Sequence, residues 1–136
     1  MKRKNFAAWA VLLFLIVSLA GCGSREENIK NTASYQQITA EEAKSMMDEQ
    51  PDAVILDVRE QDEYDAGHIP GAVLLPVGTI DEETAASAIP EKDTVVLVYC
   101  RSGNRSKTAS QALADLGYTQ IYEFGGIKGW PYEVER

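Results

Sequence analysis

The chain has 136 residues, which is enough for one domain. It carries 13 basic and 21 acidic side chains, a formal net charge of −8, which argues against nucleic acid as a partner and against electrostatic adhesion to anionic lipid. The same acidic surface favours a monomer. With only two cysteines and one histidine, neither a disulfide-stapled fold nor a zinc site is expected.

The first residues have the pattern of a targeting signal. Lys2, Arg3 and Lys4 precede an apolar run over residues 7–19, which is short for a membrane-spanning helix because such a helix needs ~20 residues. The run ends in Leu-Ala-Gly-Cys at residues 19–22, which resembles the lipobox of bacterial lipoproteins. The resemblance implies that the thiol of Cys22 is lipidated; an ordinary secretory signal and an uncleaved anchor are the alternatives.

Three segments are therefore predicted. Residues 1–21 form a lipoprotein signal peptide, residues 22–34 carry the lipidated cysteine and a polar, flexible tether, and residues 35–136 form the folded domain. Removing residues 1–21 takes away three of the 13 basic residues and none of the 21 acidic ones, which leaves a net charge of −11. We expect an extracytoplasmic domain held at the cell membrane by its lipid anchor alone.

Strands and helices are expected to alternate along the domain. In chain order, we expect a strand at residues 35–38, a helix from the Thr39–Glu42 capping box to about residue 49, a strand at 53–58, a short helix at 60–66 that Gly67 ends, a strand at 71–76, a weak helix at 80–88, a strand at 94–99, a helix at 104–116 that Gly117 ends, a strand at 120–124 and a helical turn at 126–130.

This alternation predicts an α/β fold with a mainly parallel central sheet of about five strands and helices on both faces. The run at residues 94–99, Thr-Val-Val-Leu-Val-Tyr, is apolar without alternation, so both of its faces should be covered. In such sheets, sites form beyond the carboxyl ends of the central strands. Cys100 lies at that end of the most apolar strand.

The loop after Cys100 has the composition of an anion-binding cradle around a nucleophile. Arg101 and Arg105 supply positive charge, the next helix begins within a few residues, and Gly103 allows successive amides to converge on the sulfur. Each of these features favours thiolate, so we expect the pKa of Cys100 to lie below its ordinary value. The alternative is an inert buried cysteine.

Two kinds of chemistry use such a cradle. Cysteine phosphatases place five residues between the nucleophile and an arginine, whereas four residues separate Cys100 from Arg105 here. The shorter loop suits a smaller guest than a phosphoryl group, namely the outer sulfur of a persulfide. A phosphatase would also need an acid for the leaving group, and the sequence nominates none clearly.

Three motifs in order resemble the single-domain rhodaneses. The motifs are Asp57-Val58-Arg59 with Glu63-Tyr64 and Gly67-His68-Ile69-Pro70-Gly71-Ala72; Tyr99-Cys100, Ser102-Gly103, Arg105-Ser106 and Ala109; and Gly125-Gly126 with Trp130. The resemblance covers residues 35–132 and implies a rhodanese-like fold. It also implies a thiosulfate sulfurtransferase that moves sulfane sulfur through a Cys100 persulfide, with no cofactor and no metal.

The resemblance assigns roles to the loop. Cys100 and Arg105 would be catalytic, and Arg101, Ser102, Gly103, Asn104, Arg105 and Ser106 would bind the small anionic sulfur donor and the persulfide. The acceptor would be cyanide in an assay, or a thiol, small or protein-borne. A non-catalytic module that binds or senses sulfane sulfur, or docks a partner, is the alternative, with a cysteine phosphatase or arsenate reductase behind it.

The remaining motif residues are expected to support the structure. Asp57, Arg59 and Glu63 should tie the strand end to the short helix that follows, because ion pairs that brace loops are common there. His68 is not required as a base once the thiolate exists, and Trp130 is expected to pack in the core.

Overall fold

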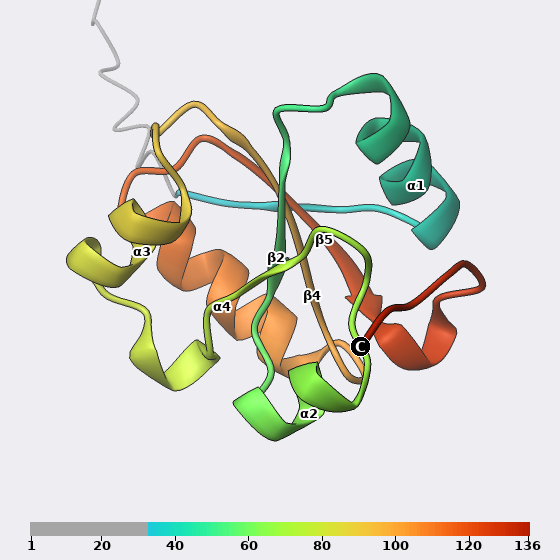
Figure 1. Cartoon of the computed structure of the whole chain (residues 1–136). Coiled ribbons are helices and arrows are strands. Elements are labelled where there is room, and N and C mark those ends of the chain that lie inside the picture. The colour runs from blue at the N-terminus through green and yellow to red at the C-terminus, as the bar shows by residue number, and fades with distance from the viewer. Residues whose placement is uncertain (1–32) are drawn as a thin grey trace, which may run out of the picture. The chain divides into compact units, whose positions relative to one another are not determined.

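A computed structural model of the chain describes residues 33–136 (Figure 1). The predicted signal peptide, the lipidation site Cys22 and most of the predicted tether lie outside the described residues. Among residues 33–136, no helix has the length and apolar character that crossing a bilayer requires.

The domain is built on one parallel sheet. Its five strands are β1 (Gln36–Gln37), β2 (Val54–Asp57), β3 (Val73–Leu74), β4 (Val95–Cys100) and β5 (Gln120–Gly126), in the spatial order β1-β5-β4-β2-β3. Every neighbouring pair is parallel. The helices are α1 (Ala40–Glu49), α2 (Gln61–Ala66), α3 (Glu82–Ala88) and α4 (Asn104–Asp115), with short 3-10 turns η1 (Val77–Thr79) and η2 (Ile127–Gly129). The predicted α/β fold with a parallel sheet is confirmed.

Strand β4 separates two hydrophobic cores. Its side chains alternate, so Val96, Val98 and Cys100 enter the core beneath α3 and α4, while Leu97 and Tyr99 enter the core beneath α1. All five of these residues are at most 1% exposed. Helices therefore cover both faces of the sheet, as the unbroken apolar run predicts (Figure 1).

The element boundaries follow local chemistry. The predicted capping box is present, because the Glu42 amide donates to Thr39 Oγ1 at 3.1 Å and the Thr39 amide donates to the Glu42 carboxylate at 2.7 Å. Strand β3 is shorter than predicted because Gly71 has a φ of 79° and Pro76 lacks an amide hydrogen. Strand β5 is longer than predicted and runs on to Gly126.

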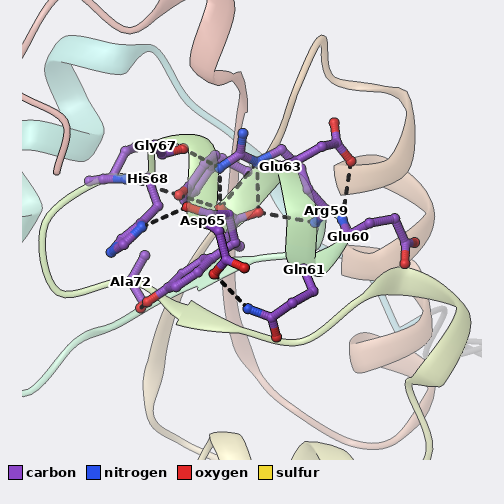
Figure 2. A network of polar contacts seen from close by, with 12 residues as sticks. Arg59, Glu60, Gln61, Glu63, Asp65, Gly67, His68 and Ala72 are labelled. Carbon is purple, nitrogen blue, oxygen red and sulfur yellow. Dashed lines mark hydrogen bonds and ion pairs between the residues drawn. The ribbon is translucent and has the colours of Figure 1, made fainter. Parts of the chain in front are cut away.

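A buried polar network closes the carboxyl end of β2. The Asp57 carboxylate, which is inaccessible to solvent, accepts hydrogen bonds from the Tyr99 hydroxyl at 2.6 Å and from the Arg59 guanidinium at 2.6 Å. The Tyr99 oxygen in turn accepts from the Ile69 amide at 3.1 Å. Arg59 also donates to the Gly67 carbonyl at 2.8 Å (Figure 2). The network joins β2, β4 and the segment after α2.

Replacing Tyr99 by phenylalanine should destabilise the fold. The change leaves one acceptor site on Asp57 and the Ile69 amide without a partner in a buried place, which typically costs about 1–3 kcal/mol. Urea unfolding of Tyr99→Phe measures the loss. Tyr122→Phe is the matched control, because the Tyr122 hydroxyl has no hydrogen bond within residues 33–136; equal stability of the two variants would contradict the assignment.

Candidate functional site

The candidate site lies where β4 passes into α4. Cys100 is the last residue of β4, and α4 begins at Asn104 after a three-residue turn. Gly103 caps the helix with a φ of 107°, a conformation that favours glycine. The chain therefore turns back over the Cys100 side chain, and the amides of Ser102, Gly103 and Ser106 face the sulfur.

The sulfur is buried and has hydrogen-bond partners from the loop and from α4. Cys100 is 1% exposed, the Gly103 amide donates to Sγ at 3.0 Å, and Ser106 Oγ lies 3.4 Å from Sγ. Burial is the largest single influence on the pKa of Cys100 and raises it. Hydrogen bonds from the Ser106 hydroxyl and from the amides of Ser106, Gly103 and Ser102 act in the opposite direction and leave the pKa below its ordinary value.

The end of β5 packs closely against this loop. A Cβ atom added at Gly126 would stand 2.0 Å from the Arg101 carbonyl oxygen, so no larger residue fits there without moving the backbone. The Lys128 amide donates to the same carbonyl oxygen at 3.2 Å. The close approach gives a physical reason for glycine in the second half of the Gly125-Gly126 pair.

The two arginines of the loop have different surroundings. Arg105 makes a bidentate ion pair with Glu63 of α2, with distances of 2.7 and 2.8 Å. Arg101 is exposed, and its side chain has no hydrogen bond or ion pair within the described part of the chain. It lines a hollow of about 400 Å³ beside the loop, together with Ser102, Gly126 and Lys128.

The other predicted residues divide into two groups. Asn104 and Ser102 are exposed on the loop, whereas Ser106 is fully buried beside the sulfur. Asp57 and Arg59 lie together in the network at the end of β2, and Glu63 reaches α4 through Arg105. The prediction did not foresee this last pair. Figure 2 shows Arg59, Glu63 and Gly67 around α2.

His68 and Trp130 lie away from the sulfur. The His68 ring stacks on Tyr64 with centroids 3.7 Å apart, and Trp130 packs against Phe124 with centroids 5.5 Å apart. Trp130, Tyr132, Ile69 and Met47 line a larger cavity of about 680 Å³. No residue of the Cys100 loop lines that cavity, so its size alone does not make it the candidate site.

One buried acid beside the loop was missed. Glu123 of β5 is 3% exposed and accepts a hydrogen bond from the Ser106 hydroxyl at 2.6 Å. The available signal was its position between apolar residues in Ile-Tyr-Glu-Phe, directly before the glycine pair. A charged residue within a strand that is covered on both faces requires polar partners.

Comparisons with known proteins agree with this geometry. The family model described as a rhodanese-like domain matches residues 39–132. The chain therefore belongs to the rhodanese-like domain family. A solved structure described as "rhodanese with anions from E. coli" superposes with a TM-score of 0.58 at 32% identity, over 62% of this chain and 98% of that one.

Relatives with assigned names are sulfur-handling proteins. Putative sulfur carrier protein YrkF of Bacillus subtilis is 32% identical over 81% of this chain and 58% of its own length. Thiosulfate sulfurtransferase GlpE of Coxiella burnetii is 35% identical over 71% of this chain and 87% of its own length. The match with YrkF thus spans little more than half of that relative.

Replacing Glu63 by glutamine should remove a pH-dependent part of the stability. Hydrogen bonds from Arg105 are the main reason why the pKa of Glu63 falls from 4.5 to about 2. Because the folded-state pKa is depressed, the stabilisation is present at neutral pH and is lost as the pH falls from about 4.5 towards 2.

The difference in unfolding free energy between wild type and Glu63→Gln should therefore be largest at neutral pH and shrink through that window. Urea unfolding at a series of pH values measures it. Asp62→Asn, at a neighbouring exposed position, controls for the loss of one negative charge. A wild-type advantage that stayed constant down to pH 2 would contradict the ion-pair account.

Proposed function

We propose that the protein is a thiosulfate sulfurtransferase that carries sulfane sulfur as a persulfide on Cys100. The observation that supports this most directly is the set of polar groups around Sγ: the Gly103 amide donates to it at 3.0 Å, and Ser106 Oγ, 3.4 Å away, accepts from the thiol and can donate to the thiolate. Such donors stabilise a thiolate before the reaction and a persulfide anion after it. GlpE, which is named a thiosulfate sulfurtransferase, gives the comparison that points the same way.

The reaction is a double displacement. The Cys100 thiolate attacks the outer sulfur of thiosulfate, the donor's S–S bond breaks, and sulfite leaves with the bonding electron pair. The outer sulfur remains bonded to Sγ as a persulfide. A thiolate acceptor, or cyanide, then attacks that outer sulfur and takes it, which returns Cys100 to the thiolate form.

The loop residues have separate roles in this reaction. The amides of Ser102, Gly103 and Ser106 hold the negative charge at the sulfur. Arg101 attracts the anionic donor into the hollow beside the loop, since its guanidinium is exposed. Arg105 contributes positive charge that its ion pair with Glu63 partly neutralises.

A second candidate is a carrier that holds sulfane sulfur without rapid turnover. The burial of Sγ, at 1% exposure of Cys100, favours retention of the bound sulfur, and YrkF is named a putative sulfur carrier. The two candidates share the persulfide and differ in how quickly an acceptor removes its outer sulfur.

Replacing Cys100 by serine should abolish sulfur transfer. With thiosulfate and cyanide as substrates, thiocyanate formation should fall by about a thousandfold or more, because the nucleophile is lost. Mass spectrometry of the wild-type protein after exposure to thiosulfate should show one added sulfur atom on Cys100. Full activity in Cys100→Ser would refute the transferase, while an added sulfur with no thiocyanate would favour the carrier.

We also propose that the mature protein is a lipoprotein on the extracytoplasmic face of the cell membrane, anchored only through Cys22. The proposal is supported by the basic, apolar and Leu-Ala-Gly-Cys segments at the start of the chain. Cys22→Ala should abolish incorporation of labelled fatty acid and move the protein out of the membrane fraction. Cys100→Ser should keep both properties, and labelling that persisted in Cys22→Ala would contradict the anchor.

A further inference from the structure

The hollow beside the Cys100 loop is lined by two cationic residues. Arg101 contributes from the loop and Lys128 from η2, and Phe124 forms part of the remaining wall. No acidic residue of the described chain lines the hollow. Glu123 precedes Phe124 in β5, but its carboxylate faces α4 on the other side of the strand. Two positive charges and no negative one therefore border a space of about 400 Å³.

These two cations are unusual in a domain with a large excess of acid. Residues 33–136 contain eight lysine and arginine side chains and 19 acidic ones. Four of the eight cations form ion pairs with acidic neighbours. The other four, Arg101, Lys107, Lys128 and Arg136, form none within these residues, and two of them line the same hollow. Cations that no acid of the described chain neutralises attract an anion most strongly where they lie together.

The main chain holds the two cationic residues next to each other. The Lys128 amide donates to the Arg101 carbonyl oxygen at 3.2 Å. Gly126 approaches the same carbonyl oxygen so closely that an added Cβ would stand 2.0 Å from it. The fold has therefore brought two like charges together before any anion arrives, and this preorganisation lowers the cost of binding one.

The hollow adjoins the reactive sulfur without enclosing it. Ser102 lines the hollow, and its amide is one of the donors to Cys100 Sγ. Cys100 itself does not line the hollow. An anion held there lies beside the loop, where it can be passed to the sulfur, and the side chains that hold it take no part in bond making.

We propose that the hollow is a binding subsite for small divalent oxyanions, and that Lys128 determines its preference for a double negative charge. Thiosulfate and sulfite, the donor and product of the proposed reaction, belong to this class. Coulomb attraction is proportional to the charge of the ligand, so one cation stabilises a bound dianion about twice as strongly as a bound monoanion. The inference rests on the proposed function for the role of the anion, and not for its binding.

Acetylation of lysines tests the subsite without sulfur transfer. Full-length Cys100→Ser protein, which lacks the nucleophile, is treated with an N-hydroxysuccinimide ester of acetic acid, with thiosulfate or with chloride at equal ionic strength. Mass spectrometry reads the rate at each lysine from its peptide. Thiosulfate should slow acetylation of Lys128 by about threefold or more, because a neighbouring anion covers the amine and favours its charged, unreactive form.

Lys107 is the internal control in the same sample. It is exposed on α4, forms no ion pair within the described residues and does not line the hollow, so its rate should be equal in thiosulfate and chloride. Unchanged acetylation of Lys128, or equal slowing of Lys128 and Lys107, overturns the proposal. Slowing confined to Lys128 supports the subsite, even if the wild-type protein transfers no sulfur and the proposed function fails.

Kinetics with two donors test the charge preference. Thiosulfate carries two negative charges and methanethiosulfonate carries one, and attack on the outer sulfur of either breaks its S–S bond and releases sulfite or methanesulfinate with the electron pair. In Lys128→Gln at low ionic strength, we expect kcat/KM to fall about tenfold for thiosulfate and about threefold for methanethiosulfonate. The loss should appear mainly in KM, because Lys128 acts on binding and not on the bond that breaks.

Two further variants separate a specific subsite from diffuse attraction. Lys128→Arg keeps the charge and should keep the preference for thiosulfate over methanethiosulfonate. Lys107→Gln removes the same charge outside the hollow and should change kcat/KM for either donor by less than about twofold. Equal losses for the two donors in Lys128→Gln, or matching losses in Lys107→Gln, overturn the charge preference assigned to Lys128.

Discussion

A sulfur atom that has lost its water can hold a negative charge only if other donors replace that water. In this domain the replacement comes from the main chain, through the turn that brings the Gly103 amide to 3.0 Å from Cys100 Sγ. The turn requires the left-handed conformation of Gly103 and the start of α4 immediately after it. The cysteine reaches this point because it is the last residue of the central strand, so β4, the turn and α4 together position the sulfur.

Most of the charged side chains near the Cys100 loop form ion pairs with one another. Asp57 binds Arg59 and the Tyr99 hydroxyl, and Glu63 binds Arg105, so two ion pairs brace the carboxyl edge of the sheet. Arg101 is left facing solvent beside the loop. Under the proposed function, an approaching anion would meet the exposed Arg101 guanidinium next to a buried sulfur, so electrostatic attraction and chemical reaction would depend on neighbouring but separate residues.

Local patterns predicted the fold well because the relevant physics is local. The unbroken apolar run at residues 94–99 identified the central strand, and the Thr39–Glu42 capping box identified the start of α1. Glu123 could not be recognised in the same way. It shares a face of β5 with Ile121, and only the packing of α4 against β5 shows that this face is buried. The Glu63–Arg105 pair likewise depends on how α2 packs near α4.

Gly126 carries no reactive group, yet a methyl group there would stand 2.0 Å from the carbonyl oxygen of Arg101. The absence of a side chain at position 126 therefore allows the loop to pack closely against β5, and any larger residue would push the loop away from the sheet. A substitution at this point would leave every reactive group in the chain intact and would displace the loop backbone that positions them. If a substitution at position 126 inactivates the protein, the cause would be a displaced loop backbone and not the loss of a reactive group.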